Sequence, residues 1–172
     1  MTAVSVSLGA AECLGFKGPQ ATAFAATLGP LPEPNHWVAL ADGTHLLRLG
    51  HNEYLLDAAD AAALATWRGR LSAARAGVVE VLHQDTAVDL SGPAVRELLR
   101  QTCALDLAAP DVLPHAVTMT QVIGVAVVAT THGDDVRLRF DPSWAHYMAH
   151  ELQAIAAELN RTKRNGGLHD PR

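Results

Sequence analysis

Cysteine, aromatic residues and positive charge are all scarce in this sequence of 172 residues. Its two cysteines, Cys13 and Cys103, show no CxxC spacing and no clustered histidine partner, so neither a disulfide framework nor a zinc knuckle is predicted. The formal net charge is −5 and the isoelectric point about 5.9. Because binding to nucleic acid or to an anionic membrane needs a concentrated positive field, the composition predicts no nucleic acid and no membrane as a partner.

Long apolar runs are also missing. The most apolar segment, residues 117–130, is interrupted by Gln121 and several threonines, and it is shorter than the roughly 20 residues that cross a bilayer. The first ten residues, MTAVSVSLGA, lack the charged region and apolar core of a secretory signal. Hydrophobic residues nevertheless make up 49% of the chain, which is typical of a globular fold. We therefore expect a cytoplasmic globular protein.

Two stretches resemble each other at an offset of 74 residues. Residues 14–29 read LGFKGPQATAFAATLG and residues 88–102 read VDLSGPAVRELLRQT. In each stretch the apolar residues first alternate, as in a half-buried strand, and then take helical spacing. The change falls at Gly18-Pro19 and at Gly92-Pro93. We predict two tight strand-to-helix corners, where glycine turns the chain and proline takes the first helical position.

Similar elements are expected after each corner. The first is followed by three short strands, with turns at 42–43 and 50–52, and by a helix over 58–73. The second is followed by strands within 117–140, with turns near 124 and at 132–135, and by a helix that begins near 142. Residues 78–82 are predicted to form a linking strand. The fold class is therefore α+β, with two tandem βαβββα pseudo-repeats packed as one pseudo-symmetric domain.

The expected boundaries follow from these elements. The domain covers residues 1–159, with half 1 at about 12–74 and half 2 at about 78–159. The polar, glycine-bearing residues 160–172 are predicted to form a flexible C-terminal tail.

Glycine at the entrance to a helix raises the question of a phosphate site at the corners. Phosphate-binding loops use several glycines and free amides at the start of the helix, and Pro19 and Pro93 each remove one amide donor. Duplication also favours an architectural role, because a single ligand site needs only one copy. We interpret Gly18, Pro19, Gly92 and Pro93 as structural corners.

Histidines offer two other candidate sites. His146 and His150 lie four residues apart on the predicted final helix, but the spacing indicates no third metal ligand. We interpret them as facing solvent or a partner, with a metal site as the secondary hypothesis. His83 beside Asp85 could form an acid–base pair, although hydrogen bonds within a turn are the favoured interpretation.

Candidate nucleophiles lack the surroundings that catalysis requires. Ser91 precedes Gly-Pro without the GxSxG elbow, and Cys103 is expected at the buried end of a helix. Asp141, before Pro142, is predicted to cap the final helix. We therefore predict no catalytic, cofactor-binding or metal residues in this chain.

Three tryptophans stand out in a chain with 5% aromatic residues. We interpret Trp37, Trp67 and Trp144 as core residues, and Trp144 is expected to share a buried stripe with Met148 and Leu152. Any tryptophan that the core leaves exposed would suit an interface.

The segment VVEVLHQDTAVDLSGPAVRELLRQTCALDL, over residues 78–107, resembles the gamma subunit of heterotetrameric sarcosine oxidase. The apolar TMTQVIGVAVVA and the closing helix continue the resemblance, and LGFKGPQATAFAATLG and LLRLGHNEYLL are similar to the first half of that subunit. The resemblance covers about residues 10–158, and its motifs are mostly structural turns. That family belongs to the folate-binding folds that include the glycine-cleavage T protein. The resemblance thus implies a single folate-binding-fold-like domain over residues 1–159.

The resemblance also implies a function. Complexes of this family oxidise sarcosine or a related N-methylated amine, and tetrahydrofolate accepts the released one-carbon unit. FAD, FMN and NAD are expected in the alpha and beta subunits, zinc in the delta subunit and tetrahydrofolate in the alpha subunit. The gamma subunit carries no cofactor and is expected to support the large subunit structurally. The expected partners are therefore the alpha, beta and delta subunits.

Two alternatives remain open at this stage. One is a free-standing folate-binding protein of the iron–sulfur-maintenance type, although such proteins carry a KGCYxGQE-like segment that has no match here. The other is a metal-dependent enzyme built on His146 and His150. The sequence does not distinguish an oxidase from a dehydrogenase, and it does not specify the amine.

Overall fold

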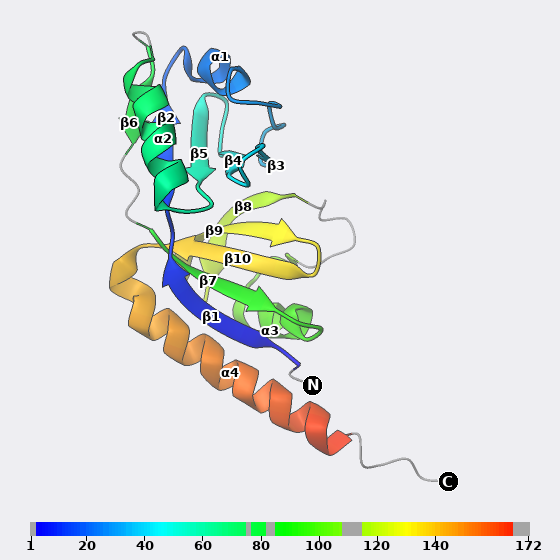
Figure 1. The fold of residues 1–172 in the computed structure, drawn as a ribbon. Helices are drawn as coiled ribbons and strands as arrows, with labels where there is room; N and C mark the ends of the chain where they lie inside the picture. The colour runs from blue at the N-terminus through cyan, green and yellow to red at the C-terminus, as the bar shows by residue number, and fades with distance from the viewer. Residues whose placement is uncertain (1–2, 75–76, 82–84, 108–114, 167–172) are drawn as a thin grey trace. The chain divides into compact units, whose positions relative to one another are not determined.

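A computed structural model describes residues 3–74, 77–81, 85–107 and 115–166. They form two compact units, each with its own five-stranded antiparallel sheet (Figure 1). The first unit comprises residues 10–85 and 115–117, and the second comprises residues 1–9, 86–114 and 118–172. Helices and antiparallel sheets are combined in both units, in agreement with the predicted α+β class.

The first unit packs two helices against one face of its sheet. The strand order is β3-β4-β5-β2-β6. Phe16 pairs with Tyr54 and Leu14 with Leu56, and all four side chains are buried in a cluster with Trp67 of α2. Asp60 caps α2 by accepting a hydrogen bond of 2.8 Å from the amide of Ala63. In chain order the elements are β2 (Cys13–Lys17), α1 (Ala21–Ala26), β3 (Trp37–Ala39), β4 (His45–Arg48), β5 (Glu53–Asp57), α2 (Ala61–Ser72) and β6 (Val79–Val81).

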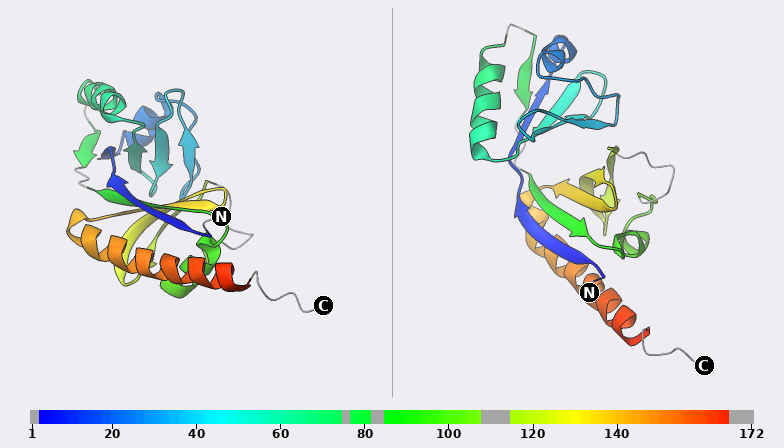
Figure 2. Two further views of the ribbon diagram at one scale, coloured as in Figure 1. Left: turned by 60° about the horizontal axis from the view of Figure 1, so that its bottom comes forward. Right: turned by 45° about the vertical axis from the view of Figure 1, so that its right-hand side comes forward.

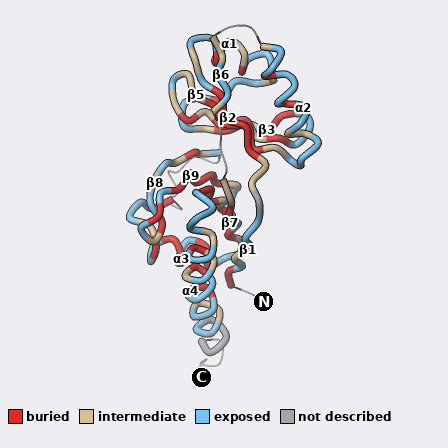
Figure 3. Tube along the Cα trace, turned by 90° about the vertical axis from the view of Figure 1, so that its left-hand side faces the viewer, coloured by how far each residue is buried: buried red, intermediate tan, exposed pale blue. Residues whose placement is uncertain are grey.

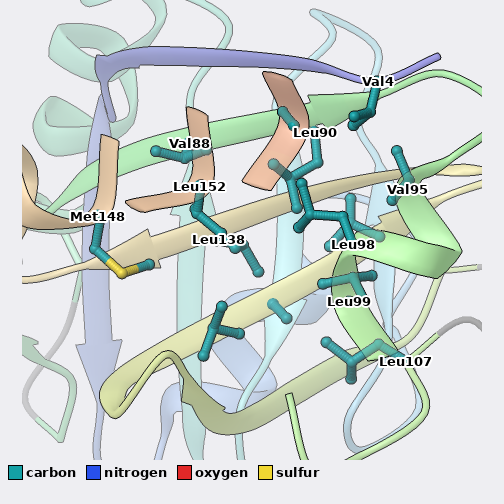
Figure 4. Packing of buried hydrophobic residues seen from close by; sticks show 14 of the residues in the cluster. Val4, Val88, Leu90, Val95, Leu98, Leu99, Leu107, Leu138, Met148 and Leu152 are labelled. Atoms are coloured by element: carbon teal, nitrogen blue, oxygen red, sulfur yellow. The ribbon is translucent and has the colours of Figure 1, made fainter. Parts of the chain in front are cut away.

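The second unit has its own core, between its sheet and two helices (Figure 4). The strand order is β1-β7-β10-β9-β8. Alternate residues of the strands, such as Val88 and Leu138, meet Leu98 of α3 and Met148 and Leu152 of α4 in this cluster. The elements are β1 (Ser5–Ala10), β7 (Thr86–Ser91), α3 (Val95–Thr102), β8 (Val117–Val122), β9 (Val125–His132), β10 (Asp135–Phe140), the short 3-10 helix η1 (Pro142–Trp144) and α4 (Ala145–Gly166).

Most of the predicted turns and helices are confirmed. Ile123 and Gly124, with φ of 45° and 82°, connect β8 to β9 as a two-residue hairpin turn requires. Gly43 and Gly133 also have positive φ, in the turns expected at 42–43 and 132–135. The helix expected over 58–73 is α2. In the described residues no helix is long and apolar enough to cross a membrane.

The compact units differ from the predicted halves in two strands (Figure 2). β6 was expected to open half 2, but it pairs with β2 and lies in the first unit. β1, which was not among the predicted strands, is hydrogen-bonded to β7 in the sheet of the second unit. These pairings join segments that are distant in sequence, so local periodicity carries no signal for them.

The predicted tail begins inside a helix, because α4 continues to Gly166. Asn160 accepts hydrogen bonds at Oδ1 from the amides of Ala3 (2.6 Å) and Val4 (3.0 Å). Its Nδ2 donates to the carbonyl of Val4 at 3.0 Å. A polar residue taken as the start of a tail is therefore a side-chain clamp on the segment that leads into β1. Figure 3 shows how burial varies along the chain.

Candidate functional site

The two Gly-Pro corners have the same backbone geometry. The amide of Ala21 donates to the carbonyl of Gly18 at 3.0 Å, and the amide of Val95 donates to that of Gly92 at 3.1 Å. Gln20 (φ −102°, ψ 5°) and Ala94 (φ −108°, ψ 12°) occupy the third position of these turns. Each corner is therefore a β-turn of type I with proline in the second position. Proline was predicted at the first helical position; instead Pro19 and Pro93 precede the first helical residue by two.

Backbone carbonyls of the chain itself close both corners. The amide of Gln20 donates to the carbonyl of Gly77 at 3.0 Å, and the amide of Ala94 donates to that of Ala3 at 2.8 Å. Gly18 has φ +134°, and a Cβ atom there would overlap the Gly77 oxygen. These amides are thus already used, and they are not available to a phosphate.

The two closing contacts repeat at the predicted offset. Gln20 and Ala94 are 74 residues apart, and so are their acceptors, Ala3 and Gly77. Gly92 has φ +108°, and a Cβ atom there would lie 2.9 Å from the Ala3 oxygen. The amide of the first corner therefore donates to a carbonyl in the segment that precedes half 2. The amide of the second corner donates to a carbonyl in the segment that precedes half 1.

An open hollow of about 470 Å³ lies beside the first corner, in the first unit. Lys17 is the cross-strand neighbour of both Glu53 and Val79, so the three side chains form one row on the same face of the sheet. The hollow offers an ammonium, a carboxylate, an imidazole and an amide, without a nucleophile beside a base. Its lining residues are Lys17, Gly18, Gly50, His51, Asn52, Glu53 and Val79.

Hydrogen bonds hold the loop at the rim of this hollow. Thr22 Oγ1 lies 3.0 Å from Asn52 Oδ1 and 2.9 Å from the Tyr54 hydroxyl. The amide of Gly18 donates to the carbonyl of Asn52 at 3.2 Å. The sequence did not predict the hollow. Residues 50–52, which line it, were predicted only as a turn.

The candidate histidine pair lies on α4. The ring centroids of His146 and His150 are 6.5 Å apart, and His150 Nδ1 lies 3.1 Å from Glu151 Oε1. Within the described ranges no three His, Cys, Asp or Glu side chains are grouped so that they could hold a metal ion. His83, for which turn hydrogen bonds were favoured over an acid–base pair with Asp85, lies outside the described residues.

The cysteines lie far apart in sequence and are both free thiols. Cys13 is buried, and its Sγ lies 3.9 Å from Asp57 Oδ1. Cys103 is half-buried at the end of α3, with its Sγ 3.9 Å from Thr120 Oγ1. Ser91 ends β7 and is half-buried.

Asp141 caps η1, as the sequence predicted. Its Oδ1 accepts a hydrogen bond of 2.8 Å from the amide of Ser143. Hydrogen bonds from the Ser143 side chain and backbone hold the pKa of Asp141 below its usual value. These hydrogen bonds therefore favour the ionised form of the carboxyl group.

Two of the three tryptophans lie in the core as predicted. Trp37 and Trp67 are 7% and 6% exposed, and Trp67 Nε1 donates to Asp42 Oδ2 (2.9 Å) and Thr44 Oγ1 (3.0 Å). The prediction is wrong for Trp144, which is 49% exposed. It ends η1, one turn before Met148, and the helical stripe does not extend back to it.

Comparisons with known proteins give the class of fold. The chain is similar to a chain of the heterotetrameric sarcosine oxidase from Corynebacterium sp. U-96 in complex with pyrrole 2-carboxylate, with a TM-score of 0.74 and 25% identity. That match covers 92% of this chain and 86% of the other. A second match is the glycine cleavage system aminomethyltransferase T from Bartonella henselae, with a TM-score of 0.69, 17% identity, and coverage of 88% of this chain and 46% of that chain. No family model matches the sequence, and no curated protein matches it.

The chain therefore has the glycine-cleavage T protein-like fold that its sequence resembles. It spans about half the length of the aminomethyltransferase, but nearly the whole length of the matched sarcosine oxidase chain.

Proposed function

We propose that this chain is the small, non-catalytic gamma subunit of a heterotetrameric sarcosine oxidase, or of a related complex that oxidatively demethylates an N-methylated amine. Its partners are the alpha, beta and delta subunits, and the complex is cytoplasmic. The complex passes the one-carbon unit to tetrahydrofolate. The chain itself supports the large subunit structurally.

The main support for this proposal is that the match with the sarcosine oxidase chain covers most of both chains. A match over 92% of this chain and 86% of the other pairs two chains of nearly equal length. The aminomethyltransferase is about twice as long, since the match covers only 46% of it. Similar length and fold favour a small subunit of an amine oxidase over a complete aminomethyltransferase. The comparisons do not favour the free-standing iron–sulfur-maintenance protein.

The cofactors belong to the partners under this proposal. FAD, FMN and NAD are bound by the alpha and beta subunits, zinc by the delta subunit and tetrahydrofolate by the alpha subunit. The closed corners support this division, because the carbonyls of Gly77 and Ala3 each take up one amide at a helix entry, that of Gln20 and that of Ala94. The catalytic groups of the complex then also lie in other chains.

The corners also support an internal pseudo-symmetry. Corner contacts between Gln20 and Gly77 and between Ala94 and Ala3 repeat with one offset of 74 residues. Each half is proposed to supply its leading strand, β1 or β6, to the sheet of the other half.

Purification of the chain alone tests the proposal. We expect a colourless protein without sarcosine oxidase activity, and calorimetric titration with folinic acid should give no heat of binding. Tight binding of folinic acid by the lone chain would favour the iron–sulfur-maintenance type instead. Bound flavin, or turnover of sarcosine by the lone chain, would refute the non-catalytic role.

A further inference from the structure

Two large aromatic side chains at the start of α4 are exposed and touch each other. Trp144 is 49% exposed and Tyr147 is 42% exposed. Their ring centroids are 5.9 Å apart, with an interplanar angle of 67°. Burying such rings against a partner is strongly favourable, and Trp and Tyr are the residue types enriched where binding energy concentrates.

The pair is held in place before any partner binds. The Tyr147 hydroxyl donates to the carbonyl of Ile123, in the turn between β8 and β9, at 3.3 Å. Trp144 follows the cap of η1, where its amide donates to the carbonyl of Asp141 at 3.0 Å. A binding surface whose side chains are already ordered loses less entropy on association.

The charge beside the rings indicates what they would bind. The Asp141 carboxylate is exposed and lies three residues before Trp144. Aspartate is ionised at neutral pH, and the hydrogen bonds from Ser143 favour this charged form further. A guanidinium group stacks on aromatic rings and also pairs with a carboxylate, so arginine fits both features. An anionic membrane does not fit, because the Asp141 carboxylate would repel it, and the Asp141 carboxylate of a second copy would be repelled in the same way.

We propose that the surface formed by Asp141, Trp144 and Tyr147 binds a partner subunit through an arginine side chain of that subunit. This inference rests on the proposed function, and it names the part of the chain that contacts the larger complex. Arginine, tryptophan and tyrosine are the residue types that most often dominate an interface. The loss of either aromatic side chain should therefore cost most of the affinity.

The test measures binding of the purified chain to the complex of alpha, beta and delta subunits that the proposed function gives as its partners. The change Trp144→Ala should weaken binding by about 30-fold or more, as expected of a dominant interface residue. Met119→Ala is the matched control, because Met119 is also in the second unit and is 61% exposed. It should change the affinity by less than about twofold.

A second variant tests whether the partner contributes a positively charged side chain such as arginine. Asparagine caps a helix about as well as aspartate, so Asp141→Asn keeps the cap of η1 and removes the charge. It should weaken binding and reduce the dependence of the affinity on salt. Unchanged melting temperatures of the variants would show that folding is intact.

The outcomes separate this inference from the proposed function. If the wild-type chain binds and Trp144→Ala binds equally well, the inference fails and the proposed function stands. If Asp141→Asn has no effect on affinity or salt dependence, the arginine partner is refuted. If the wild-type chain does not bind these subunits, the proposed function fails and the inference fails with it. Dimerisation of the lone chain that Trp144→Ala abolishes, or its adsorption to phosphatidylserine vesicles, would also refute the inference.

Discussion

The change Gly18→Ala should destabilise the chain through two costs that the structure identifies. Gly18 has φ +134°, where a residue with a side chain is strained by about 1–3 kcal/mol. The new Cβ atom would also overlap the oxygen of Gly77, which accepts a hydrogen bond from Gln20. Displacing that oxygen weakens a bond worth about 1 kcal/mol. The expected loss in the free energy of unfolding is therefore about 2–4 kcal/mol, a large share of the stability of an ordinary domain.

Urea unfolding followed by circular dichroism measures this loss, and two other glycines serve as references. Gly92→Ala should cost less than Gly18→Ala, because its Cβ atom would lie 2.9 Å from the oxygen of Ala3. Gly69 lies in α2 with nothing within 4 Å of its Cβ position, so Gly69→Ala should stabilise by about 0.5–1 kcal/mol. Equal stabilities for Gly18→Ala and Gly69→Ala would refute the account of the corners.

Three further predictions concern contacts that fasten individual elements. Asn160→Leu removes the three hydrogen bonds to Ala3 and Val4, so urea unfolding should show a loss of about 1–3 kcal/mol; an unchanged midpoint would argue against the clamp. Trp67→Phe removes two hydrogen bonds of a buried indole and should cost about 1–2 kcal/mol in the same assay, and no loss would count against them. Asp141→Ala should lower the stability at neutral pH, because the Asp141 pKa is below its usual value in the folded chain. That difference should vanish as the pH falls through the folded-state pKa, and a difference that persists in acid would contradict the cap.

The spacing of apolar residues and the turn residues predicted those elements whose structure depends on neighbouring residues, namely the two corners and α2. The period change at Gly18-Pro19 and Gly92-Pro93 located both corners, and the helix predicted at 58–73 is α2. The position of proline within each corner was wrong by two residues. Periodicity does not distinguish the first turn of a helix from the β-turn that precedes it, since both place φ near the value that proline prefers.

Long-range pairings and exposed residues were harder to predict. In β1, Val6 and Leu8 alternate with Ser5 and Ser7, but this local pattern does not reveal that β1 pairs with β7. Asn160 has a polar side chain of the kind found in tails, but its amide matches the backbone groups of Ala3 and Val4. Trp144 continues the spacing of the buried stripe, yet it belongs to η1, where the chain has not yet entered α4. For β1 and Asn160 the outcome depends on a partner segment that is distant in sequence.

The proposed role is tested most directly by native mass spectrometry of this chain co-expressed with the alpha, beta and delta subunits of the proposed complex. We expect one intact four-subunit complex that contains this chain, and gas-phase dissociation should release the chain at the mass of its bare polypeptide. If the chain stays apart from the other three subunits, or if it leaves the complex with flavin or folate bound, the role of a cofactor-free supporting subunit is contradicted.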